Sequence, residues 1–151
     1  MSSVKDEIRS AAEKLSLPRA DFRKLPDSEA EVIYWKALRH FVREGEPRWW
    51  WEHFSSGIGV DFPAGDGWRH IPDLVPNSNE HVWFIVEDDL CPFYPVYDAT
   101  ADAICAVIAE CYGFEYYIVH PQLDWLICET HHNRIVAVGK VVEEKLRKYT
   151  S

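Results

Sequence analysis

The chain has 151 residues, of which 47% are hydrophobic and 14% aromatic, and its formal net charge is −9. This length and composition predict one folded domain over residues 1–151 and exclude a largely disordered chain. The charge is uneven, because residues 71–139 contain one Arg against eleven Asp and Glu, whereas residues 1–70 are nearly balanced. Such a surface repels phosphate backbones and anionic lipids, so we expect neither nucleic acid nor a membrane as partner.

The N-terminal residues alternate charged with apolar types and resemble neither a signal peptide nor a spanning segment. No C-x-x-C pair is present, and three of the four cysteines lie in apolar stretches. We therefore expect a cytoplasmic protein whose cysteines are reduced core residues. These are Cys91, Cys105, Cys111 and Cys128.

Residues 1–54 are predicted to be mainly helical. Ser3 can cap a helix that Pro18 ends, and Ser28 with Glu31 forms a possible capping box for a second helix. Residues 55–80 contain four glycines and three prolines, which predicts a long irregular loop. A loop of this length in a small domain is often functional.

Residues 81–151 are predicted to carry the sheet. A helix over 101–112, capped by Asp98 or Thr100, and a closing helix over 141–149 accompany the strands. The predicted strands are 81–86, one starting near Pro95, 114–119, 123–130 and 135–138. The fold class is therefore α+β, with about five strands in a mixed or antiparallel sheet and the element order ααββαβββα.

Carboxylates in the sheet-bearing part predict a negative face. Few basic residues are near them in the sequence, so they would attract a basic protein partner. The residues assigned to this face are Glu87, Asp88, Asp89, Asp98, Asp102 and Glu115.

Three consecutive tryptophans, Trp49, Trp50 and Trp51, form a second candidate binding element. Three successive side chains cannot all face one core in a helix or a strand, so at least one should be partly exposed. An exposed Trp is typical of protein-interaction hot spots. A Trp covered by the 55–80 loop would be structural, and burial of the cluster in a homodimer is a further possibility.

A metal site is the competing hypothesis. Cys128, Glu129, His131 and His132 lie within five residues and offer thiolate, carboxylate and imidazole ligands. However, Cys128 and Glu129 should face opposite sides of a strand, and the histidines fall in a predicted turn.

Acid–base catalysis is a related possibility, because His120 has several carboxylates near it in the sequence. These carboxylates are Glu110, Glu115, Asp124 and Glu129. The common nucleophile, zinc-protease and phosphate-binding motifs are missing from the sequence. Solvated carboxylates and turn histidines account for the pattern better than a catalytic site does.

Three blocks of sequence resemble an uncharacterised family of small acidic bacterial proteins. The blocks are 48–52 (RWWWE), 81–88 (HVWFIVED), and 110–117 (ECYGFEYY) with 125–132 (WLICETHH). The resemblance implies a bacterial origin and a domain that stands alone, and it implies no catalytic residues. In size, acidity and αβ content the chain is also similar, generically, to the immunity proteins that neutralise toxins.

The sequence therefore favours a non-catalytic, cytoplasmic protein-binding domain that engages a basic partner and needs no cofactor. An immunity or regulatory role is its most concrete form. The alternative is a small metal-dependent enzyme that uses the segment 128–132.

Overall fold

The first helix begins where the sequence supplies a cap. The Ser3 hydroxyl accepts a hydrogen bond from the Asp6 N–H at 3.2 Å, and α1 runs from Val4 to Lys14. The predicted helix is confirmed, with Ile8 and Ala11 on its buried face. The computed structural model describes residues 3–43, 45–47, 49–88 and 93–150.

Seven strands form one sheet in the described chain. They are β1 (Phe22–Lys24), β2 (Ile58–Asp61), β3 (His81–Val86), β4 (Val96–Thr100), β5 (Tyr116–Val119), β6 (Leu126–Glu129) and β7 (Arg134–Val138). Their order across the sheet is β1-β4-β3-β5-β6-β7-β2, and every neighbouring pair is antiparallel. Since β4 and β5 both pair with β3, these two strands run parallel to each other across it.

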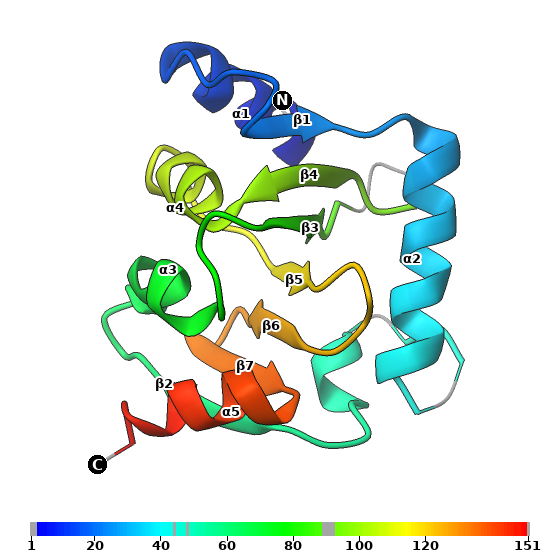
Figure 1. Cartoon of the computed structure of the whole chain (residues 1–151), viewed down its shortest axis with the longest axis vertical. Coiled ribbons are helices and arrows are strands. Elements are labelled where there is room, and N and C mark those ends of the chain that lie inside the picture. Colours follow the sequence, from blue (N-terminus) through cyan, green and yellow to red (C-terminus); the bar gives the residue numbers. More distant parts are fainter. Residues whose placement is uncertain (1–2, 44, 48, 89–92, 151) are drawn as a thin grey trace.

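Helices cover both faces of the sheet (Figure 1). The further helices are α2 (Asp27–Phe41), α3 (Ile71–Leu74), α4 (Ala101–Ala109) and α5 (Lys140–Arg147). One face carries α2 and the short 3₁₀ helix η1 (Trp50–Glu52), and the other carries α1, α3, α4 and α5 (Figure 1). Each face has its own buried cluster, and successive strand residues such as Tyr116 and Tyr117 belong to opposite clusters.

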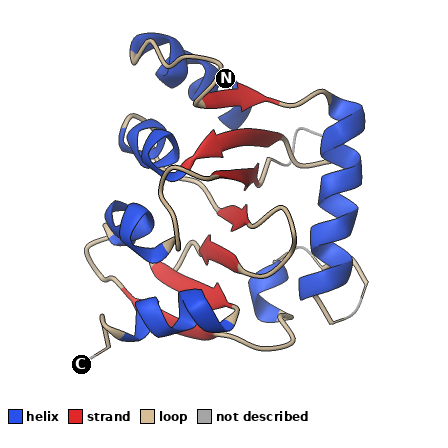
Figure 2. Cartoon of the chain, in the orientation of Figure 1, coloured by secondary structure: helices blue, strands red, loops and turns tan. Residues whose placement is uncertain are grey.

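The predicted number of strands, about five, was too low. The observed order is α1 β1 α2 β2 α3 β3 β4 α4 β5 β6 β7 α5, so β1, β2 and α3 were missed (Figure 2). The two missed strands lie at the two edges of the sheet and have three and four residues. Strands this short show too little alternation for the sequence to reveal them.

The prediction of an irregular loop over 55–80 was wrong. This range contains β2, the 3₁₀ helix η2 (Gly67–His70) and α3. Gly57 has a φ of +131°, and a Cβ there would lie 2.9 Å from the carbonyl oxygen of Ala137 in β7. The glycine therefore permits the close approach of an edge strand, where the sequence suggested only a chain break.

Other boundaries follow local chemistry. Thr100, rather than Asp98, caps α4 by accepting from the Ala103 N–H, and β4 begins directly after Pro95 as predicted. The capping box at Ser28 was wrong, because α2 begins one residue earlier, behind Pro26, with no side-chain cap bond. Asp27 and Glu29 in the first turn interact favourably with the positive end of the helix dipole, which supports this helix start without a side-chain cap.

The longest described helix, α2, has 15 residues. No described helix combines the length and apolar character that a membrane crossing requires.

Candidate functional site

The tryptophan triplet divides between the core and the surface, as its spacing predicted. Trp50 is fully buried and stacks on Tyr117 with 4.6 Å between ring centroids. Trp49 and Trp51 are half-buried and stack on each other at 6.1 Å. The 3₁₀ turn of η1 produces this split because successive side chains point about 120° apart.

Histidines from the turn between β6 and β7 complete this aromatic cluster. The ring of His131 lies 5.4 Å from that of Trp49 and 5.5 Å from that of Trp51, and His132 lies 5.6 Å from Trp51. Buried Thr130 fixes the turn, because its hydroxyl accepts a hydrogen bond from the His132 N–H at 3.1 Å. Segments 49–51 and 131–132, far apart in the sequence, therefore form one patch.

Glu115 connects this patch to the sheet. One carboxylate oxygen accepts a hydrogen bond from the Trp51 indole N–H at 2.8 Å, and the other is hydrogen-bonded to His131 Nδ1. Only 11% of the Glu115 side chain is exposed. Both oxygens of this carboxylate are thus held by the aromatic patch, which orients Trp51 and His131 together.

A cavity of about 440 Å³ opens beside Glu115, between the end of α4 and the β6–β7 turn. We call it the acidic hollow. Its lining includes Trp68, Phe114, Glu115, Glu129, Thr130 and His131. None of its described lining residues is Lys or Arg.

Glu129 is the titratable group that the fold perturbs most clearly in the hollow. The pKa of Glu129 is raised to about 7, mainly by burial; the neighbouring Tyr116 hydroxyl opposes this shift and the charge of Asp66 adds to it. Tyr116 is the cross-strand partner of Glu129, and burial holds the pKa of its own hydroxyl well above the usual range. The carboxyl of Glu129 is therefore poised to change charge near neutral pH.

The strand register gathers three carboxylates at this end of the sheet. Glu87 follows β3 and donates its backbone N–H to the carbonyl of Glu115 at 3.1 Å, and Glu129 lies opposite Tyr116 on the next strand. Glu87 and Glu115 are thus neighbours across the ends of β3 and β5, whereas Glu129 is in register with Tyr116, the residue after Glu115. Two of these, Glu87 and Glu115, belong to the predicted acidic face.

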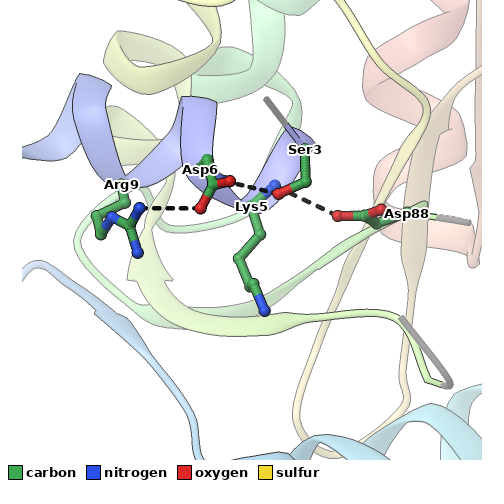
Figure 3. A network of polar contacts seen from close by, with 5 residues as sticks. All are labelled: Ser3, Lys5, Asp6, Arg9 and Asp88. Carbon is green, nitrogen blue, oxygen red and sulfur yellow. Dashed lines mark hydrogen bonds and ion pairs between the residues drawn. The ribbon is translucent and has the colours of Figure 1, made fainter. Parts of the chain in front are cut away.

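The other residues of that predicted face lie elsewhere. Asp88 is 4% exposed, and its carboxylate accepts the Lys5 backbone N–H at 3.4 Å (Figure 3). Asp98 is hydrogen-bonded to His81 at 2.9 Å and forms an ion pair with Arg23 at 3.7 Å. Asp102 is exposed in the first turn of α4, and Asp89 lies outside the described residues. The five of these carboxylates that the structure describes are therefore not brought together on one face.

Two of the metal candidates, Cys128 and Glu129, face opposite sides of the sheet. Cys128 faces the α2 side of the sheet, where burial raises the pKa of its thiol well above the usual range, whereas Glu129 faces the hollow. The described residues contain no group of three or more His, Cys, Asp or Glu side chains suited to a metal ion. The thiols of Cys105, Cys111 and Cys128 are free, and Cys91 is outside the described residues.

Of the four carboxylates proposed from the sequence as partners of His120, Asp124 alone is shown beside it among the described residues. His120 lies 3.3 Å from Glu80 and 3.4 Å from Asp124, at the opposite end of β5 from Glu115. Glu110 forms an ion pair with Lys14 at 2.7 Å. Of the carboxylates proposed from sequence as partners of His120, Glu115 and Glu129 line the acidic hollow instead.

Two residues of the site were not predicted from the sequence. Tyr112 lines the hollow with its side chain 99% exposed, although its helical spacing predicted a core position. Helix α4 ends at Ala109, so Tyr112 lies past the last turn and points outward. In the sequence, Tyr116 looks like any aromatic residue of a strand. Only the pairing of β5 with β6 places it opposite Glu129.

Comparison with known proteins gives one result. Neither the curated proteins nor the solved structures contain a match to this chain. The profile of the Family of unknown function (DUF6756) matches residues 1–150. Because the match spans nearly the whole sequence, the chain belongs to this family of unknown function.

Proposed function

We propose that the protein is a non-catalytic, cytoplasmic binding domain that receives a cationic side chain of a basic protein partner in the acidic hollow. The observation that carries the proposal is the pair Glu115 and Glu129 in a cavity whose described lining holds no Lys or Arg. An immunity or regulatory role in a bacterium would be the finer form of this function. The free thiols of Cys105, Cys111 and Cys128 support a reducing compartment.

A cation in the hollow would relieve an electrostatic cost that the fold itself creates. Burial raises the pKa of Glu129 to about 7 because the ionised carboxylate is poorly solvated there. A guanidinium or ammonium group beside Glu129 stabilises the ionised form and lowers this pKa. Binding should therefore release protons below about pH 7 and strengthen as the pH rises through that value.

The aromatic rim suits the remainder of a long basic side chain. Trp68, Phe114 and the exposed Tyr112 line the hollow. Trp51 donates its indole N–H to Glu115, which lines the hollow as well. Aromatic faces attract cations and also pack against the methylene stems of Lys and Arg. The same residue types are the ones most enriched in protein-interaction hot spots.

The test uses N-acetyl-arginine amide as the probe and amide chemical shifts as the signal. Titration should shift the amides of Gly113, Glu115 and 129–132, and the shifts should weaken strongly in Glu129→Gln. Asp102→Asn is the matched control, because Asp102 is an exposed carboxylate outside the hollow, and it should leave the shifts unchanged.

Two outcomes would reject the proposal. One is an equal response to uncharged N-acetyl-norleucine amide, which would show that the charge of the probe is irrelevant. The other is an unchanged arginine response in Glu129→Gln.

Acid–base catalysis in the same hollow is a second candidate, supported by the pKa of about 7 for Glu129. General acids and bases work best with a pKa near the operating pH. Hydrolysis of p-nitrophenyl acetate that rises with pH through 7 and disappears in Glu129→Gln would favour this function. Equal rates for the two proteins would remove it.

A further inference from the structure

A second cavity, of about 560 Å³, lies between α1 and the edge strand β1. We call it the basic groove, because its lining includes four cationic residues and one acidic residue, Glu13. The cations are Lys5, Arg9, Arg19 and Lys24. This excess of positive charge stands on a chain whose net charge is −9, and the groove shares no lining residue with the acidic hollow.

The floor of the groove is apolar. Ile8 is fully buried, and the rings of Phe22 and Tyr97 stack on each other with their centroids 5.1 Å apart. The bonded pair of strands β1 and β4 carries these two rings. An apolar surface below and charges above are the features of a site for an amphipathic small molecule.

The cations around the groove are weakly engaged. Arg9 pairs with Asp6 at 2.9 Å and Lys24 with Asp27 at 3.3 Å, and both are exposed pairs of the kind that contribute little. The side chains of Lys5 and Arg19 form no ion pair with the described residues. Figure 3 shows the Lys5 side chain extending away from the helix and from Asp88. These cations are available to an external anion.

We propose that the basic groove binds a small amphipathic carboxylate, aliphatic or aromatic. The hydrocarbon part would lie on Leu17, Phe22 and Tyr97, and the carboxylate would meet the cations of the rim. A cavity of this volume falls within the usual range of about 300–1,000 Å³ for small-molecule sites. Burial of the hydrocarbon supplies affinity, and the charges select for an anion.

The experiment uses the fluorescent anion 8-anilinonaphthalene-1-sulfonate as the reporter. The full chain should enhance its fluorescence, and octanoate should displace it, whereas octanol at the same concentration should displace it much less. In Arg19→Glu/Lys24→Glu we expect about tenfold weaker binding of the reporter, because a pair of attractive charges becomes repulsive. Both residues are exposed, so the variant should keep its fold.

The matched control reverses charges at another groove. A cavity of about 600 Å³ along α2 is lined by Trp35, Lys36 and Arg39, and Lys36→Glu/Arg39→Glu should leave reporter binding unchanged. Equal losses of reporter binding in the two variants would contradict the proposal, since the effect would then depend on the net charge of the protein and not on the groove. Equal displacement by octanol and octanoate would also contradict it. If Arg19→Glu/Lys24→Glu unfolds, Ala12→Phe, which fills the groove, must still weaken the reporter signal.

Discussion

The acidic hollow beside β5 and β6 and the basic groove between α1 and β1 differ in how far their charges are buried. Glu115 and Glu129 project from strand ends between packed elements, and burial raises the pKa of Glu129 to about 7. Arg9, Arg19 and Lys24 are exposed around a groove whose apolar floor is supplied by other residues. Burial makes the hollow sensitive to pH, whereas exposure leaves the groove cations charged and screened by solvent.

Trp50→Ala should have the largest effect on stability, and it tests the packing next to the acidic hollow. Trp50 is fully buried, packs on Tyr117 and fixes the position of Trp49 and Trp51. Removing a buried indole should lower the free energy of unfolding by about 3 to 5 kcal/mol. Urea unfolding measures this, and Trp51→Ala, at a half-buried site, should cost clearly less. Equal losses of unfolding free energy in Trp50→Ala and Trp51→Ala would mean that η1 does not separate a core Trp from a surface Trp.

Phe22→Ala tests the floor of the basic groove. Phe22 is buried and stacks on Tyr97, but it belongs to a three-residue edge strand that can relax. The expected loss in unfolding free energy is about 2 to 4 kcal/mol, with weaker reporter binding at temperatures where the variant is folded. Full reporter binding by the folded variant would show that the floor does not contribute to the groove.

Glu129→Gln tests whether burial sets the chemistry of the hollow. A carboxyl whose pKa is raised in the folded state stabilises the fold below its unfolded value of about 4.5, and that stability is lost as the pH rises toward 7. Relative to the parent chain, Glu129→Gln should therefore gain about 1 to 2 kcal/mol at pH 8 and little at pH 5. Urea unfolding at the two pH values provides the comparison, and a gain independent of pH would contradict the raised pKa.

Arg19→Glu should have the smallest effect on stability. Because Arg19 is exposed and forms no ion pair with the described residues, its reversal should change the free energy of unfolding by about 0.5 kcal/mol or less. The change should be the same at pH 6 and pH 8. A large or pH-dependent loss would show that Arg19 has a structural role, and the contrast between the two sites would no longer hold.

Much of the fold follows from local pattern. The cap at Ser3, the start of β4 after Pro95 and the strand at 81–86 were predictable because each rests on residues adjacent in the sequence. The α+β class follows from the same local signals. The edge strands β1 and β2 were not predictable, since their pairing partners lie more than 70 residues away.

The site was predictable only as separate parts. The sequence indicated that the tryptophans would split between core and surface and that Cys128 and Glu129 would face opposite ways, and both predictions are confirmed. It also grouped Asp98 and Asp102 with Glu115, although the strand register places Asp98 beside Arg23 on β1. Charge counted along a sequence does not reveal which side of a sheet, or which end of a strand, each carboxylate occupies.

Composition, periodicity and capping signals therefore determined the four longer helices, the central strands and the acidity of this protein, because these properties depend on neighbouring residues. Tertiary structure alone decided that Glu115, Trp51 and His131 meet, and that Glu129 lies over Tyr116 in a partly buried cavity. The physical reason is that hydrogen bonding and desolvation depend on distance in space, which the pairing of β5 with β6 and the packing of η1 establish.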